Sequence, residues 1–569
     1  MMAIDRCALI YVWFLTLTTL GLEVIASDEV QLQYELELRS GPIVAVAVHF
    51  KASENGHTHI ALRKEWGGIV NNGADVTELS VIDSENNACS FERESAESWL
   101  ITHAPSASLT VSYQIQVTGE RARLPGNDYR TRLDSQLFQM ISNLGLLMPQ
   151  HISQDQPAEF QIAFRGFDEA GWQVVSSFGL GCGPFDVYLS PSKFLQSIVM
   201  AGNLNIVTRD IESNRIAVAI AGTDWLFRGD ELADALESIV RAQRDFFGDH
   251  SDSWYLVTLT PNPSGPPGSM SLGGTALTNC FALYCTTNLS LDRRSPESQR
   301  TLSLLAHEYF HNWNGIKIPT AGNDPSTYWF SEGFTNFFAR RMLLRAELIT
   351  AEQFATDLSA TVQDYDNNPH RLAANVLISQ GFWTDRQMGD VPYKRGELLA
   401  LAIDEHIRQR SQGRQSLDDL ILDLFRRPMT EAPVTTEVLL ERIGEWVDAE
   451  MLPVIRGVVI EGTEVSLPTA VTEPSLELTL AQARNFDPGF NLEASREAKK
   501  VVGVHEQGNA YAAGLRDGQE LQGFSVSRRD GIPKAEVVIL IDGSPNTIEY
   551  EAVGPVRDVR VFRTIQTKS

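Results

Sequence analysis

The sequence has few cysteines and no excess of basic side chains. It contains 5 cysteines, 47 Lys and Arg residues and 73 Asp and Glu residues in 569 positions, for a formal net charge of −26. Sequence-independent binding to nucleic acid needs a basic face, and docking on an anionic membrane surface needs clustered Lys and Arg. The composition therefore argues against both kinds of partner.

Long apolar runs are also scarce, and the main one lies at the N-terminus. Arg6 precedes an apolar run from Cys7 to Leu22, and small or aliphatic residues lead to Ala26. This pattern is typical of a cleaved signal peptide, and a run of about 16 residues is short for a membrane span of about 20. We therefore expect residues 1–26 to be removed and the protein to be periplasmic or secreted, without stable membrane insertion. An N-terminal membrane anchor is the alternative.

Four cysteines remain after the signal: Cys89, Cys182, Cys280 and Cys285. In an oxidising compartment they would allow two disulfides, in any of three connectivities. Free thiols are the alternative, and the sequence leaves the pairing open. No C-x-x-C pair is present, so these residues lack the spacing of a cysteine zinc site.

Hydrophobic patterning divides the mature chain into three parts. Strict alternation in segments such as 30–38 and 109–117 predicts half-buried strands, and it indicates a β-sandwich-like domain over 27–195. Strand and helix signals mix over 196–473, and the pattern returns to strands and turns over 474–569. Beyond residue 295 we expect a helix up to Asn314 and further helices around 331–347, 351–366, 392–410, 416–427 and 435–448.

A metal-binding pattern lies on the helix that starts at Pro296. Its segment His307-Glu308-Tyr309-Phe310-His311 places two histidines at i and i+4, on one helical face, where both imidazoles reach one Zn²⁺. Glu308 is next to the first histidine, where it can act as general base for the attacking water. The helix is strongly apolar and hence buried, and buried histidines need polar partners. The pattern predicts one zinc ion per chain.

A catalytic zinc site needs a third protein ligand and keeps its fourth position open. No third histidine follows at the spacing H-E-x-x-H-x-x-G-x-x-H. Glu332, at the start of an apolar helix downstream, is the best candidate. The alternative is a helix-start glutamate favoured by the helix dipole.

The segments HEYFHNWN and WFSEGFTNFF together resemble the gluzincin metallopeptidases. Within them the chain is most similar to the glycyl aminopeptidase family, peptidase family sixty-one, whose members carry a C-terminal PDZ domain. The resemblance covers the mature chain and implies a multidomain α+β fold. Its parts are an N-terminal β-sandwich-like domain, a thermolysin-like catalytic domain with a mixed sheet and a helical half, and a C-terminal PDZ domain.

The same resemblance assigns roles to individual residues. It implies that His307, His311 and Glu332 bind zinc and that Glu308 is the general base. It also implies an electrophilic tyrosine, for which Tyr393, expected at the start of a helix, is in the right place. A phenol there would donate to the developing oxyanion. A buried core tyrosine is the alternative reading, and Tyr328 and Tyr365 are weaker candidates.

The glycine pair Gly273-Gly274 stands where relatives carry a substrate-binding strand followed by a glutamate that holds the substrate's amine. The positions that match the glutamate are Ala276 and Leu277, so this anchor is missing. The strand could still pair with substrate backbone, and the candidate substrate-binding residues are Gly273, Gly274, Thr275 and Asn279. An ordinary glycine turn is the alternative.

Near the C-terminus, Asp487-Pro488-Gly489-Phe490-Asn491-Leu492 resembles the carboxylate-binding loop of a PDZ domain. Backbone N–H groups at Gly489 and Phe490 would then capture a peptide C-terminus. The alternative is a structural lid that binds no peptide.

These observations predict a zinc-dependent metallopeptidase that hydrolyses peptide bonds. We expect an aminopeptidase that favours small N-terminal residues such as Gly or Ala, with peptides or proteins as substrates. Two alternatives stay open. One is a zinc endopeptidase without an amine anchor, and the other is a periplasmic PDZ peptide-binding scaffold with a structural metal.

Overall fold

The computed structural model describes residues 31–565 except for 40, 42, 67–68, 71, 118–127, 252, 263–270, 293–294, 321–323, 427–433 and 530–531. The expected signal peptide, residues 1–26, lies outside the described residues. The chain divides into two compact units. The first unit comprises residues 1–118, 142–166 and 182–196, and the second comprises 119–141, 167–181 and 197–569.

The first unit is built from strands with alternating burial. On β1, for example, Leu32, Tyr34 and Leu36 are buried, because successive side chains of a strand point to opposite faces. The strands form one sheet of order β16-β13-β1-β2-β9-β6 and another of order β12-β3-β8-β7. Their bounds, with those of the small elements beside them, are β1 (Gln31–Arg39), β2 (Ile43–Lys51), β3 (His57–Ala61), β4 (Glu65–Trp66), β5 (Ile69–Val70), β6 (Val76–Asp83), β7 (Ser90–Arg93), β8 (Ser98–Thr102), β9 (Ser108–Gln116), β12 (Met148–Pro149), β13 (Ala158–Arg165), β16 (Phe185–Leu189) and α1 (Pro191–Leu195). The expected β-rich N-terminal region is confirmed.

The second unit contains a sheet that draws in two segments from before residue 195. Its order is β10-β11-β17-β14-β15, and its strands are β10 (Arg132–Leu133), β11 (Leu137–Ile141), β14 (Gln173–Ser176), β15 (Gly179–Leu180) and β17 (Ile198–Gly202). The central strand β17 pairs with both β11 and β14. These ladders tie segments 119–141 and 167–181 to the second unit, so the division between units is not a single cut near 195.

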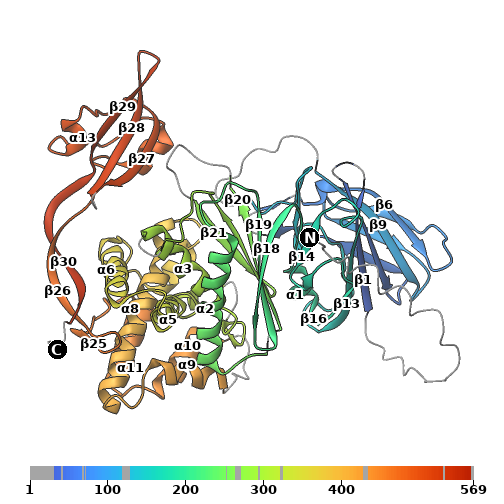
Figure 1. Ribbon diagram of the computed structural model, residues 1–569, viewed down its shortest axis with the longest axis horizontal. Coiled ribbons are helices and arrows are strands. Elements are labelled where there is room, and N and C mark those ends of the chain that lie inside the picture. Colours follow the sequence, from blue (N-terminus) through green and yellow to red (C-terminus); the bar gives the residue numbers. More distant parts are fainter. Residues whose placement is uncertain are drawn as a thin grey trace, which may run out of the picture. The chain divides into compact units, whose positions relative to one another are not determined.

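A five-stranded mixed sheet of order β18-β19-β20-β22-β21 follows (Figure 1). Its strands are β18 (Leu204–Ile211), β19 (Asn214–Ala221), β20 (Trp254–Pro261), β21 (Leu272–Leu277) and β22 (Cys280–Cys285). Strands β19, β20 and β22 are parallel, and β21 is an antiparallel edge strand. Helix α2 (Gly229–Phe247) connects β19 to β20 and buries Leu232, Leu236 and Val240. It ends at Gly248, whose φ of 62° is left-handed, a common helix stop.

The helical half begins with α3 (Pro296–Phe310) and continues through α11. Its other elements are α4 (Tyr328–Ser331), α5 (Gly333–Arg345), α6 (Ala351–Asn367), α7 (Asn375–Gly381), α8 (Arg386–Ser411), α9 (Leu417–Arg426), α10 (Thr436–Gly444), α11 (Met451–Arg456) and the short strands β23 (Asn314–Gly315) and β24 (Ile318–Pro319). Two expectations were wrong. Helix α3 ends at Phe310 rather than at Asn314, because the amides of Asn312 and Trp313 donate to carbonyls three residues back, those of Tyr309 and Phe310, and do not continue the α-helical pattern. Helix α8 begins at Arg386 rather than at Pro392, because Asp385 caps the amides of Gln387 and Met388, and Pro392 lies inside the helix without ending it.

The C-terminal region consists of two small sheets and two short helices. One sheet has the order β25-β26-β30 and the other β27-β28-β29. The elements are β25 (Ala470–Val471), β26 (Leu476–Phe486), α12 (Leu492–Ala498), α13 (Asn509–Ala512), β27 (Glu520–Arg529), β28 (Ile532–Ile541), β29 (Ser544–Glu551) and β30 (Val553–Thr564). Strand β30 packs against α6, where the amide of Phe562 donates to Ser359 Oγ at 2.8 Å.

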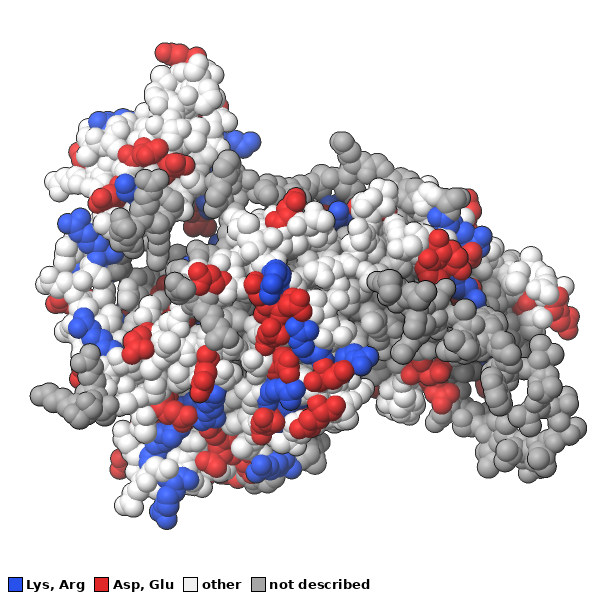
Figure 2. Space-filling model, viewed as in Figure 1, with Lys and Arg blue, Asp and Glu red and all other residues white. Residues whose placement is uncertain are grey.

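Three further features of the described residues concern charge, thiols and membrane spans. Acidic and basic side chains intermix over the helices on the face shown in Figure 2. Cys89, Cys280 and Cys285 are free thiols, so two disulfides are not formed among the described residues. None of the described helices has the length and apolarity to cross a membrane.

Candidate zinc centre and catalytic cavity

Helix α3 carries both histidines into the interior. Ser295 caps it by accepting from the amide of Ser298, and Pro296 occupies its first turn. His307 lies in the last full turn of α3 and His311 directly after its end. The apolar face of α3, including Leu302, Leu305 and Phe310, belongs to the main hydrophobic core, so the imidazoles are held by a rigid element.

Glu332 is the residue between α4 and α5. Its position depends on a close approach of α5 to α8 at Gly333 and Gly396. A Cβ on Gly396 would lie 1.9 Å from the carbonyl oxygen of Trp329 and 2.8 Å from Gly333 Cα. Only glycine allows this approach, and it brings Tyr393, one turn before Gly396 on α8, toward Glu332.

The three predicted ligands converge. His307 Nε2 lies 3.2 Å from Glu332 Oε2 and 3.0 Å from His311 Nε2, and His311 Nε2 lies 3.6 Å from Glu332 Oε2. Ligand atoms bound to zinc at about 2.0–2.1 Å in a tetrahedron are about 3.3 Å apart. The distances therefore match three corners of a zinc tetrahedron, and the His-His-Glu set is that of catalytic zinc sites.

Two asparagines that the sequence analysis did not single out orient the histidine rings. His307 Nδ1 lies 2.9 Å from Asn336 Oδ1, and His311 Nδ1 lies 2.9 Å from the carbonyl oxygen of Asn314. Because both acceptors require an Nδ1–H donor, both Nε2 lone pairs point to one place. Two lone pairs and a carboxylate oxygen at such distances are stable only around a cation. The spacing of Asn336, one helical turn after Glu332, was the available signal.

The electrostatics of the three ligands favour positive charge between them. Burial lowers the pKa of His311, but the adjacent Glu332 and Glu308 carboxylates raise it to about 9. Burial raises the pKa of Glu332, but His311 and His307 together hold it well below its usual range. A zinc ion, with two positive charges, would be stabilised by the same carboxylate in place of the proton on His311.

Glu308 and Tyr393 complete the polar surface of the site. Burial raises the pKa of Glu308, although the two histidines oppose this effect. Burial, followed by the carboxylates of Glu332 and Glu308, raises the pKa of Tyr393 well above its usual value, so this phenol keeps its proton. The ring of Tyr393 lies 6.4 Å from that of His307.

Tyr365 and Tyr328, the weaker candidates for the oxyanion donor, do not line the cavity of the site. The hydroxyl of Tyr365 donates to the carbonyl of Arg371 at 3.2 Å. The ring of Tyr328 packs edge-on against Phe382, and burial raises its pKa to about 12.

One cavity of about 810 Å³ contains the site. It is lined by His307, Glu308, Glu332 and Tyr393, and by Leu272, Gly273 and Gly274 of edge strand β21. Thr275 and Asn279 do not line it. Asn279 lies in the turn before β22, where its carbonyl accepts from the amide of Leu256.

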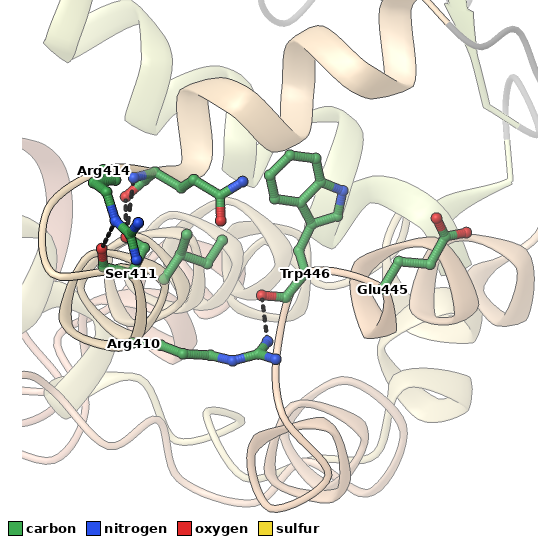
Figure 3. A pocket seen from close by; sticks show the side chains of 7 residues that line it. Arg410, Ser411, Arg414, Glu445 and Trp446 are labelled. Carbon is green, nitrogen blue, oxygen red and sulfur yellow. Dashed lines mark hydrogen bonds between the residues drawn. The ribbon is translucent and has the colours of Figure 1, made fainter.

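A second cavity, of about 730 Å³, lies at the C-terminal end of α8 (Figure 3). Its arginines are engaged within the protein: Arg410 donates to the carbonyl of Trp446, and Arg414 donates to that of Ser411. It is not lined by any of the ligand residues and carries no chemistry of its own.

The C-terminal loop with Gly489 and Phe490 is occupied by internal bonds. The amide of Gly489 donates to Asp487 Oδ1 at 2.7 Å, and Phe490 is buried against Phe524. The next amide, that of Asn491, donates to the carbonyl of Val502, and α12 begins directly afterwards. A helix, α12, therefore follows the loop directly.

Comparison with known proteins places the metal site in a family context. Residues 300–391 match the model of the M61 glycyl aminopeptidase family. This segment contains both histidines, Glu308 and Glu332. It is the catalytic segment of a gluzincin zinc metallopeptidase.

No curated protein matches the chain of this metallopeptidase. Among solved structures, an aminopeptidase N family protein from Idiomarina loihiensis is similar over 94% of this chain and 98% of its own, at 16% identity and a TM-score of 0.68. This likeness shows a shared fold. An M1 zinc metallopeptidase from Deinococcus radiodurans is also similar, over 78% of this chain and 96% of its own, at 16% identity and a TM-score of 0.48.

Proposed function

We propose that the metallopeptidase removes N-terminal residues from peptides. The observation that supports this most is the convergence of His307, His311 and Glu332, beside a cavity whose lining includes Glu308 and Tyr393. Bound Zn²⁺ would supply Lewis-acid polarisation of the scissile carbonyl and of the attacking water.

The residues around the ligands then perform the remaining steps. Glu308 takes a proton from the attacking water as the oxygen adds to the carbonyl carbon, and the Tyr393 hydroxyl donates to the oxyanion that forms. The C–N bond breaks when Glu308 passes the proton to the leaving amine. The raised pKa of Tyr393 suits this role, because an ionised phenol would repel the oxyanion.

The preference for small N-terminal residues such as Gly or Ala is part of the proposal and rests on the family of residues 300–391. The test uses peptides that differ only in a free or an acetylated N-terminus. We expect hydrolysis of the free peptides and a loss of at least about 100-fold in kcat/KM for the acetylated ones. Equal rates would indicate the endopeptidase alternative, which the absence of an acidic residue at Ala276 and Leu277 favours.

Substitution of the base separates the enzyme from a scaffold. Glu308→Gln keeps the shape of the side chain and all three ligands but removes the proton acceptor. We expect it to retain zinc and to lose about 10³-fold or more of the hydrolysis rate. Unchanged hydrolysis would mean that the metal is structural.

Two further features belong to this proposal. We assign residues 474–569 to a PDZ-like domain, supported by the sequence of the loop from Asp487 to Leu492. Its ligand would be a peptide C-terminus, and binding would require the internal hydrogen bonds of the Gly489 and Asn491 amides to open. We also propose export to the periplasm or secretion, supported by the signal-like pattern of residues 1–26. Detection of a mature chain starting at Ser27 in an exported fraction would test the export proposal.

A further inference from the structure

The backbone of edge strand β21 alternates between its neighbour β22 and the open edge. The carbonyl of Ser271 accepts from the amide of Thr286, at 3.0 Å, so Ser271 faces the β22 side. In an antiparallel ladder both backbone groups of a residue point the same way, and the next residue points the other way. The backbone N–H and C=O groups of Leu272 and Gly274 therefore point away from β22, toward the open edge. The hydroxyl of Tyr129 donates to the carbonyl of Gly274 at 3.0 Å from this outer side.

The proposed mechanism and the extent of the cavity together give the direction in which a peptide would lie along β21. In the proposed mechanism the leaving amine lies beside Glu308. From there the cavity continues along the preceding turns of α3, past Leu304 and Arg300, and along β21 it includes Leu272 to Gly274 but not Thr275. The portion after the scissile bond therefore occupies the cavity, and any residue before that bond lies toward Gly274 and beyond.

Tyr129 contacts β21 at Gly274, where the lining of the cavity ends along this strand. Its ring packs edge-on against Tyr284 of β22, with centroids 5.1 Å apart and an interplanar angle of 89°. A peptide residue pairing with Gly274 would offer an N–H to the same carbonyl that Tyr129 already engages. The aromatic ring, held by a neighbouring strand, also occupies space along the edge.

We propose that Tyr129 is a stop that closes the pairing edge of β21 at Gly274, so that the site accepts a terminal residue but no chain ahead of it. The proposal rests on the proposed aminopeptidase function and deepens it. It accounts for Ala276 and Leu277, where a carboxylate is missing, because the free terminus is selected by shape rather than by charge.

A substrate series on the unmodified protein tests the proposal. Three peptides of one sequence begin with glycyl, with glycolyl (a hydroxyl in place of the amine) or with N-acetylglycyl. A stop predicts that the glycolyl peptide is cleaved within about fivefold of the glycyl peptide, whereas the acetylated one falls by at least about 100-fold in kcat/KM. A glycolyl peptide that falls as far as the acetylated one would overturn the stop in favour of a charged anchor.

Substitutions at Tyr129 provide the second test. Tyr129→Ala should raise the ratio of acetylated to free-peptide kcat/KM at least about tenfold, and Tyr129→Phe, which keeps the ring, should leave it within about threefold of wild type. Tyr188→Ala, at an exposed position on β16, is the matched control and should change neither rate. Zinc content and circular dichroism verify folding.

The possible failures are distinguishable. A folded Tyr129→Ala protein with the wild-type ratio overturns the stop alone. Wild-type protein that cleaves acetylated and free peptides equally overturns the aminopeptidase function itself. If Tyr129→Ala does not fold, the kcat/KM of the wild-type protein for the glycolyl peptide still tests the stop.

Discussion

Asn336 controls the metal site without touching the metal. Its Oδ1 accepts from His307 Nδ1, which fixes the tautomer that turns Nε2 toward zinc. Loss of such an outer partner typically lowers metal affinity by about 10–100-fold. We therefore expect Asn336→Ala to lower zinc affinity by about 10–100-fold, measured by titration against a competing chelator. Asn203→Ala, at an exposed position, is the control. If the Asn336→Ala protein bound zinc as tightly as the Asn203→Ala protein, the role of Asn336 would be contradicted.

Asp249 links the ends of α2 and α3. Its carboxylate accepts from Trp313 Nε1 at 2.8 Å and from Lys317 Nζ at 2.5 Å. Burial raises the pKa of Asp249, but Lys317, Ser251 and Trp313 together hold it well below its usual range. A lowered pKa stabilises the folded state above the unfolded value of about 3.9, and this contribution is lost as the pH falls toward the folded value.

Asp249→Asn should therefore cost the most stability near neutral pH. The difference in unfolding free energy between wild type and variant should shrink as the pH falls below about 4. Urea unfolding at pH 7, 4 and 3 measures it. Zinc loss in acid affects both proteins alike, so a difference that stays constant with pH would show that the carboxylate's charge is not involved.

At the scale of elements, the contact between α5 and α8 positions Glu332 against Tyr393. The contact depends on Gly333 and Gly396, where an added Cβ meets backbone rather than a flexible side chain. We expect Gly396→Ala to destabilise the protein by about 1–3 kcal/mol and to lower kcat as Tyr393 is displaced. Gly523→Ala is the control, because its Cβ would meet only ordinary contacts at 3.8 Å, and it should leave stability and kcat unchanged. Thermal unfolding and steady-state kinetics measure these quantities for both variants.

Elements with strong local signals were predictable. The i, i+4 histidines and the apolar helix around them follow from spacing, and α6 and α9 lie within a residue or so of expectation. Glu332 was a candidate from its place at the start of an apolar helix, and its role as a ligand came from the family resemblance. The start of α8 was missed because Pro392 reads as a first-turn proline, whereas Asp385 provides the actual cap. Periodicity does not show which of several capping signals the chain uses.

Contacts between distant segments were not predictable. The pairing of β11 and β14 with β17 joins segments from before residue 195 to the second unit, and no local pattern marks it. Tyr129 lies 145 positions from Gly274 in the chain, so its hydrogen bond could not be inferred from either neighbourhood.

For the whole molecule, the metal site is continuous with the main core. Because His307 and His311 belong to a helix whose apolar face lies in that core, bound zinc should stabilise the folded chain by mass action. Chelation should lower the thermal unfolding midpoint by several degrees and abolish hydrolysis, and added Zn²⁺ should restore both. A Glu332→Gln protein is the control, since its midpoint should respond little to either treatment.

The pairing of β26 with β30 has a consequence for engineering the C-terminal region. The two strands run side by side from Leu476↔Thr564 to Phe486↔Val553, and β30 returns to α6. Everything between residues 487 and 552 is therefore an insertion at the tip of a hairpin rather than a tail. Truncating the chain after β26 would strip a strand from α6, whereas excising 487–552 and joining the hairpin by a short turn would leave that surface covered. Domain exchange in this protein should cut twice, at the hairpin tip.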